Sequence, residues 1–146
     1  MKLLLSLILC LILVAFAADT FAGEFDKYRP YVAKDTEEIY ATWVNPEAKS
    51  GHPQRSIYKA NSTVEWFMSA NSGAPDYIGR YLIVNKWTDS EGNIWYKIHA
   101  VSPHHENYII IKISNSGNTL EIVEDRVDYP IKIDPKHVWY VKYSRE

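Results

Sequence analysis

Residues 78–100 read IGRYLIVNKWTDSEGNIWYKIHA, which is two extended segments joined by a polar turn. Apolar and polar side chains alternate on both sides of the turn. Tyr81 and Ile83 share one face of the segment before the turn, and Tyr96 and Ile98 share one face of the segment after it. Alternation with a period of two is typical of strands with one buried face. Because the turn is rich in Asp, Ser, Gly and Asn, the stretch predicts a β-hairpin with one apolar face.

Similar segments continue on both sides of this hairpin. They are short, rich in β-branched and aromatic residues, and separated by Gly, Pro, Asn and Ser. The predicted strands are 38–44, 55–60, 63–69, 78–87, 94–101, 108–114, 119–125 and 138–145. No long amphipathic segment interrupts the series, which argues against an α/β fold.

The connections between these strands alternate in length. The first, third, fifth and seventh are predicted to run 10, 8, 6 and 12 residues, and the others 2, 6 and 4. Consecutive connections of an antiparallel meander lie at opposite ends, so the long ones share one end. Closing such a sheet removes its exposed edges. We therefore expect an all-β fold, an eight-stranded up-and-down antiparallel barrel, whose interior fits side chains or one small ligand.

The N-terminus has the features of a secretory signal peptide. Lys2 supplies a positive charge, and residues 3–17 are almost wholly apolar. That run is shorter than the roughly 20 residues that a membrane-spanning helix needs. Small residues offer cleavage after Ala17 or after Ala22, and the more ordinary cleavage region favours Ala22. A retained N-terminal anchor is the alternative.

The predicted organisation is a signal peptide over 1–22, an N-terminal arm over 23–37 and one barrel domain over 38–146. Export places the mature protein in the periplasm or outside the cell. Lipid attachment at Cys10 is not expected, because a large residue precedes it and the apolar run continues beyond it. The mature chain then has no cysteine, so the barrel depends on its core alone.

The charge balance argues against several classes of partner. There are 16 Lys and Arg against 18 Asp and Glu, a net charge of −2, and no segment collects one sign. A nucleic-acid partner would call for a basic face, and a membrane surface for a basic strip. We expect no nucleic-acid partner, no transmembrane segment in the mature chain, and a monomer.

Three parts of the chain resemble bacterial lipocalin-like proteins of the calycin type. The segment Ala41-Thr42-Trp43-Val44-Asn45 lies at the first strand, where lipocalins keep a Gly-x-Trp. Residues 81–97 are similar to the central hairpin of these small exported barrels. Asp128-Tyr129-Pro130 and Tyr143-Ser144-Arg145 are similar to their C-terminal segment. The resemblance spans about residues 38–145.

This resemblance implies a structural contact and a function. Arg145 is expected to pack across the ring of Trp43, and the barrel is expected to bind a small hydrophobic molecule inside. The chain departs from the family pattern in three ways: Ala41 replaces the usual Gly, the disulfide pair is missing, and no long helix precedes the last strand.

The inward row of aromatic and apolar side chains has two interpretations that the residues alone leave open. They line a ligand cavity, or they fill a packed core with no void. A buried Tyr needs a hydrogen-bond partner, which favours a wet or ligand-holding interior. The expected ligand-binding residues are Trp66, Met68, Tyr81, Ile83, Tyr96, Ile98 and Ile111. The alternative function is a protein-interaction or inhibitor module acting through the loops 45–54, 70–77 and 126–137.

Catalytic and metal-binding signals are weak. The cluster His104-His105-Glu106 has metal-ligand types, but a zinc site needs three or four converging ligands. The chain has no Gly-x-Ser-x-Gly and no phosphate-binding loop. Glu65, Glu121 and Asp125 could meet as catalytic carboxylates, although surface alternation explains each of them more simply. We expect no enzyme activity, no cofactor and no metal.

Overall fold

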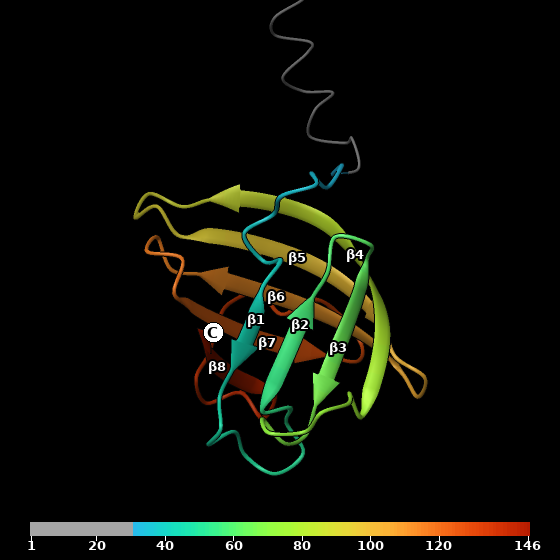
Figure 1. Ribbon diagram of the computed structural model, residues 1–146. Helices are drawn as coiled ribbons and strands as arrows, with labels where there is room; N and C mark the ends of the chain where they lie inside the picture. Colours follow the sequence, from blue (N-terminus) through green and yellow to red (C-terminus); the bar gives the residue numbers. More distant parts are fainter. Residues whose placement is uncertain (1–30) are drawn as a thin grey trace, which may run out of the picture. The chain divides into compact units, whose positions relative to one another are not determined.

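The computed structural model describes residues 31–146, so the expected signal peptide and most of the expected arm lie outside the described residues. Eight strands follow one another along this part of the chain (Figure 1). Their bounds are β1 (Thr42–Val44), β2 (Arg55–Tyr58), β3 (Thr63–Phe67), β4 (Tyr77–Thr88), β5 (Ile94–Val101), β6 (Glu106–Ile113), β7 (Thr119–Asp125) and β8 (Tyr140–Arg145). Each one overlaps a strand that the alternation of side chains predicts.

The eight strands form a closed barrel. Each strand pairs antiparallel with the next along the chain, and β8 returns to pair with β1. At this closing seam Trp43 lies opposite Arg145, and Val44 lies opposite Ser144. The prediction of an eight-stranded up-and-down antiparallel barrel is confirmed.

The connections at one end are mostly long, but one is shorter than expected. The β1–β2, β3–β4 and β7–β8 connections at this end run over 45–54, 68–76 and 126–139, whereas β5–β6 has only the four residues 102–105. The prediction of a six-residue connection there is wrong, because Glu106 already pairs with Val101. We call this end of the barrel the open end, and the opposite one the closed end.

The residues before β1 pack over the closed end instead of extending the strand. The backbone N–H of Tyr40 donates to the carbonyl of Glu37 at 3.0 Å, which turns the chain. Ile39 is fully buried, and the Trp43 Nε1 donates to its carbonyl at 3.0 Å. We call this segment before β1, residues 31–41, the plug. The predicted first strand therefore begins four residues too early, because 38–41 belong to the plug.

The closed half of the barrel is filled with side chains. Its largest fully buried members come from the plug and from β1, β5, β6 and β7. They include Ile39, Trp43, Tyr96, Ile98, Ile111, Ile113 and Leu120. Those that belong to strands point inward, as expected for alternating side chains on a closed sheet.

A β-bulge in β4 reverses the inward row of that strand. The register shifts between Ile83 and Asn85 in the pairing with β5. Beyond the shift, Lys86 points inward to bond Glu37, while Trp87 is 40% exposed. Strict alternation places Trp87 on the face of Ile83, and that prediction is wrong because a bulge inserts one extra residue.

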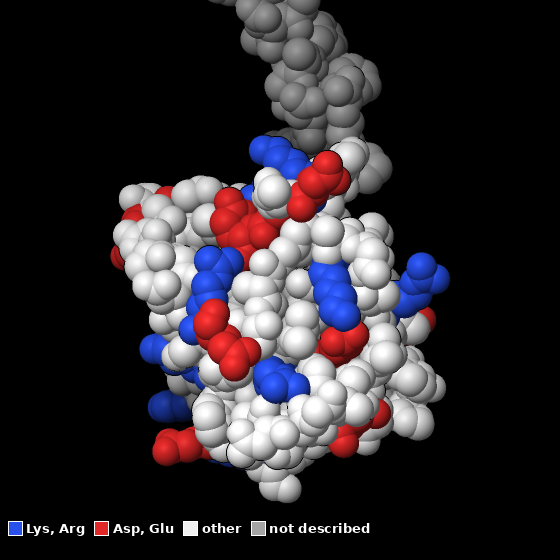
Figure 2. Space-filling view, in the orientation of Figure 1, with Lys and Arg blue, Asp and Glu red and all other residues white. Residues whose placement is uncertain are grey.

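Charged side chains of both signs are scattered over the outer surface. Figure 2 shows Lys and Arg interspersed with Asp and Glu on the visible face, with uncharged surface between them. One outer pair is Lys59 with Glu65, which form an ion pair across the β2–β3 hairpin. The visible face carries no broad area of a single sign, in line with the balanced composition of the chain.

Candidate functional site

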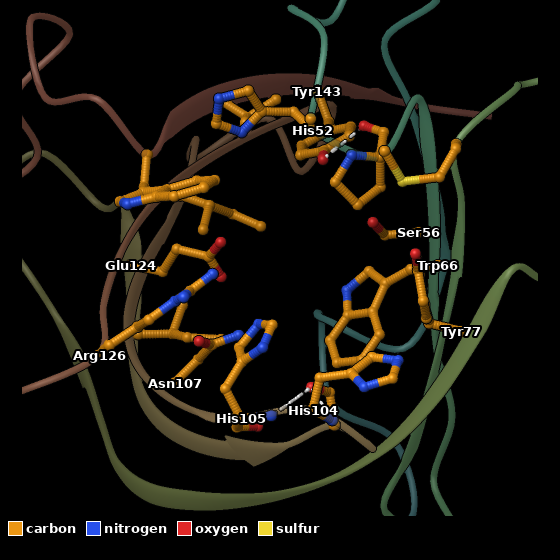
Figure 3. Close-up of a pocket in the computed structure, with 18 of the residues that line it drawn as sticks. His52, Ser56, Trp66, Tyr77, His104, His105, Asn107, Glu124, Arg126 and Tyr143 are labelled. Carbon is orange, nitrogen blue, oxygen red and sulfur yellow. Dashed lines mark hydrogen bonds between the residues drawn. The ribbon is translucent and has the colours of Figure 1, made fainter.

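A cavity of about 290 Å³ occupies the open half of the barrel. Side chains of β2, β3, β4, β6, β7 and β8 form its wall, and residues of all four open-end connections form its rim. Its apolar lining consists mainly of Tyr58, Trp66, Met68, Tyr77, Ile109, Ile122, Trp139, Val141 and Tyr143. Its polar lining includes His52, Ser56, Ser102, His104, His105, Asn107, Glu124 and Arg126 (Figure 3).

The inward row of β7 changes from apolar to polar side chains toward the mouth, where the cavity lies. On β7 the row runs Leu120, Ile122, Glu124 and then Arg126 just past the strand end. Leu120 is fully buried in the closed half, whereas Glu124 and Arg126 line the cavity. Polar side chains thus replace apolar ones toward the mouth, where the inward residues line a cavity instead of filling a core.

Glu124 is the most unusual residue of the lining. Its carboxylate points into the cavity, on the opposite side from the indole of Trp66 (Figure 3). Among residues 31–146, no side chain or backbone group forms a hydrogen bond or ion pair with it. Burial raises the pKa of Glu124 to about 7, and the nearby Arg126 charge offsets this only in part.

Hydroxyl groups share the cavity with this carboxylate. Tyr58 and Tyr143 belong to the same lining, and the charge of Glu124 adds to the burial that raises the pKa values of both phenols. The Tyr143 hydroxyl donates to the carbonyl of Pro53 at 2.8 Å, so it is already satisfied. Tyr58 is buried without a hydrogen-bond partner among the described residues, which leaves its hydroxyl free to bond a ligand or water.

The basic groups of the lining sit nearer the rim. The guanidinium carbon of Arg126 lies 5.5 Å from the ring centroid of Trp139. His52 packs edge-on against the same indole, with centroids 5.3 Å apart. Burial lowers the pKa of His52 and of His105, and Arg126 lowers that of His105 further. Both imidazoles are therefore neutral at pH 7, and Arg126 is the fixed positive charge of the lining.

Arg55 fixes one wall of the mouth from outside the cavity. Its guanidinium lies over the Phe67 ring at 3.9 Å and donates to the carbonyls of Ala70 at 2.9 Å and Ser72 at 2.6 Å. The β3–β4 connection is thereby tied to β2, and Met68 is held at the rim. Strand alternation alone gives no sign of this role.

The structure places the seven expected ligand-binding residues in two groups. Trp66 and Met68 line the cavity. The other five lie outside its lining, packed in the buried core: Tyr81, Ile83, Tyr96, Ile98 and Ile111. Both interpretations of the interior are thus present, with a filled core at the closed end and an open cavity at the other.

The expected structural pair is in contact at the seam. The Arg145 guanidinium carbon lies 5.1 Å from the ring centroid of Trp43. Its Nη2 also donates to the carbonyl of Glu38 at 2.7 Å, so Arg145 joins the last strand to the plug. This contact stabilises the closure of the barrel and lies away from the cavity.

Residues considered for catalysis or metal binding do not converge. Glu65 pairs with Lys59, Glu121 accepts from Tyr140 at 2.9 Å, and Asp125 accepts from the backbone of Val127. Within residues 31–146, no three His, Cys, Asp or Glu side chains lie close enough to hold a metal ion. Nor does that part of the chain contain a helix long and apolar enough to cross a membrane.

The key residue of the lining, Glu124, was missed from the sequence although a signal for it exists. It lies on the same face of β7 as the inward residues Leu120 and Ile122, whereas Glu121 lies on the opposite face. A carboxylate on an inward row near an open mouth is a candidate for ligand recognition.

Comparisons with known proteins leave the site to be judged on its own geometry. No protein-family model, curated protein or solved structure matches this chain with significance.

Proposed function

We propose that this protein is an exported, lipocalin-like barrel that binds a small, largely apolar molecule in its open half. The observation that supports this most directly is the cavity of about 290 Å³, walled by aromatic and aliphatic side chains with a few polar groups. Sites for small molecules have this composition and volumes from roughly 300 Å³ upward.

Two further features support the family and the location that we propose. The closed barrel of eight antiparallel strands and the Arg145–Trp43 contact are what the resemblance to lipocalins implies. The apolar stretch at 3–17 with small residues after it supports export. We further propose that the mature protein is a monomer, since closure leaves no strand edge for a second copy.

The lining supports binding rather than catalysis. A carboxyl group with a raised pKa also occurs in enzymes, where it acts with a nucleophile or a second acid–base group within hydrogen-bond reach. Glu124 has no such partner among the described residues. Its position suits recognition of a ligand group.

Native mass spectrometry of the protein purified from its own host tests the proposal. We expect a retained small molecule, and thermal stabilisation by members of a panel of small apolar compounds. An empty barrel that no member of the panel stabilises would refute interior binding.

Two variants make this test specific for the cavity. Val141→Phe adds bulk to an inward residue of the lining, and should abolish retention of the molecule. Leu82→Phe adds a ring to an outward side chain that is 61% exposed, and should leave retention unchanged. Circular dichroism establishes that both variants keep the barrel.

A second candidate function is an interaction through the open-end loops. The long β7–β8 connection exposes large apolar side chains, namely Val127 at 86%, Ile131 at 96% and Val138 at 71%. Exposed apolar groups of this kind often mark a binding surface. Replacing 126–137 with a Gly/Ser linker should then remove a partner recovered from envelope extract, and unchanged recovery would contradict this candidate.

A further inference from the structure

The unpaired carboxylate of Glu124 indicates which chemical class of molecule the cavity takes; the argument rests on the proposed interior binding. A carboxylate in a poorly solvated site needs a charged or hydrogen-bonding partner, because leaving it alone is costly. Among residues 31–146, no side chain lies within ion-pair or hydrogen-bond distance of it, and the nearby charge of Arg126 compensates it only in part. An apolar molecule filling the cavity would remove water from Glu124 and raise this cost.

The aromatic walls around the carboxylate suit a positive charge. Tyr58, Trp66, Tyr77, Trp139 and Tyr143 all contribute to the lining. The faces of aromatic rings attract cations, and several rings around one cavity are a recurring means of binding organic ammonium groups. Carboxylate and aromatic faces together favour an ammonium group over a neutral one.

The basic side chains of the lining do not take the place of such a ligand. Arg126 lies on the Trp139 ring near the mouth and forms no ion pair with another described residue. Arg126 is an exposed residue, so water solvates its charge without help from Glu124. An anionic ligand could meet Arg126 at the rim, but its body would then cover Glu124 and leave that carboxylate without a partner.

We propose that the cavity binds a small organic cation, a protonated primary amine on an aromatic or aliphatic body, with the ammonium group paired to Glu124. The body fills the space between Trp66, Ile109, Ile122 and Val141. The Tyr58 hydroxyl has no hydrogen-bond partner among the described residues, belongs to the same lining and can accept a second ammonium hydrogen.

Isothermal calorimetry at pH 8 with two matched series tests this proposal. Tryptamine, tryptophol and indole-3-acetate share an indole body and carry a cation, a neutral hydroxyl and an anion. The compounds 2-phenylethylamine, 2-phenylethanol and phenylacetate repeat the comparison with a smaller body. We expect the amine of at least one series to bind about 10- to 100-fold more tightly than its alcohol, the range that a charge-assisted hydrogen bond adds.

Variants assign the preference to one carboxylate. Glu124→Gln should bring amine and alcohol to similar affinity while the alcohol binds as before. Glu121→Gln, which changes an outward carboxylate of the same strand, should keep the preference. Equal binding of amine and alcohol, or tighter binding of the anion, would overturn the inference and leave interior binding standing. If none of the six compounds binds, the inference fails, and native mass spectrometry decides the proposed function separately.

Discussion

Gly79 is the residue on which the position of Trp66 depends. A Cβ atom built at Gly79 would lie 2.5 Å from Cζ3 of the Trp66 ring and 2.9 Å from the carbonyl oxygen of Val101. The indole therefore packs directly against the backbone of β4. A glycine in a strand often marks such a close approach, and here it gives the cavity one of its aromatic walls.

Gly79→Ala should destabilise the protein by about 1–3 kcal/mol, the usual effect of forcing a methyl group into a filled space. Urea denaturation followed by tryptophan fluorescence measures this, and a changed native emission would report the displaced ring. Gly73→Ala is the control, because a Cβ there meets nothing within 4 Å. Equal stability of the two variants would show that the Trp66 ring moves aside freely.

Glu124 should make the stability of the protein depend on pH near neutrality. Folding raises the pKa of this carboxyl from 4.5 to about 7. At low pH the group is protonated in both states, so folding has no effect on it. As the pH rises from 4.5 through 7, the unfolded chain gives up the proton more readily, and stability falls.

Glu124→Gln should therefore stabilise the ligand-free protein at pH 8 by about 1–3 kcal/mol and leave its stability near pH 4.5 unchanged. Urea denaturation at both pH values measures the difference. Glu121→Gln is the control for removing one negative charge from β7. A constant difference at the two pH values would contradict a raised pKa for Glu124.

The sequence limits what can be predicted about these two residues. Alternation along β7 is enough to place Glu124 on the inward face, because Leu120 and Ile122 share its parity. Whether an inward residue meets a core or a cavity depends on the side chains of the strands facing it. Five of the expected lining residues face inward as predicted and still lie in the filled half. Their distance from the mouth determines whether they meet the core or the cavity.

At the scale of elements, the bulge in β4 and the plug before β1 act together. The bulge turns Lys86 inward, where its Nζ bonds the Glu37 carboxylate at 2.7 Å and also pairs with Glu38. Glu37 accepts three more hydrogen bonds, from the Tyr31 hydroxyl, the backbone of Lys34 and the Tyr96 hydroxyl. Burial alone would raise the pKa of Glu37, but these bonds lower it to about 2.

Lys86→Met should destabilise the protein by about 3 kcal/mol at pH 7, because it leaves the fully buried Glu37 carboxylate without its cation. Urea denaturation measures this loss. Lys142→Met is the control, since Lys142 is an exposed outward residue of β8. Similar losses in the two variants would mean that the inward position of Lys86 contributes nothing.

The pH dependence gives this network a second signature. Because folding lowers the pKa of Glu37 from 4.5 to about 2, its contribution to stability is complete above pH 4.5 and is lost as the pH falls toward 2. In Lys86→Met that pKa should rise, so the variant should lose less stability between pH 5 and pH 3 than the wild type. A parallel loss in both proteins would contradict the network.

The strands were predictable because each has a local pattern, and the bulge was not. Residues 78–100 alternate well enough to predict the β4–β5 hairpin, but one extra residue near Val84 leaves no local trace. What selects the bulge is a partner far along the chain, the pair of glutamates at 37 and 38. The four residues of the first predicted strand that become part of the plug were missed for the same reason.

At the scale of the whole molecule, the barrel has a filled half and an open half. The pairing of β8 with β1 joins the last strand to the first, and Arg145 bonds this seam to the plug. Below the cavity, side chains from five different strands meet in one core: Trp43, Tyr81, Tyr96, Ile98, Ile111 and Leu120. At the mouth, polar residues such as Asn107, Glu124 and Arg126 line the cavity, and three of the four connections are nine or more residues long.

This asymmetry should appear in hydrogen exchange. Local opening requires less free energy where few apolar contacts must break, so amides near the mouth should exchange faster than those of the core. We expect the slowest exchange in 94–99 and 109–113, and exchange at least about ten-fold faster in 100–101, 106–107 and 123–125, the paired mouth ends of the same strands. Mass spectrometry of peptides from the ligand-free protein measures these rates. The comparison within a single hairpin separates the effect of the cavity from that of strand pairing, because both segments have ladder neighbours. Uniform protection along β5, β6 and β7 would mean that the open half is packed as firmly as the closed one, which would contradict a cavity that is open to ligands.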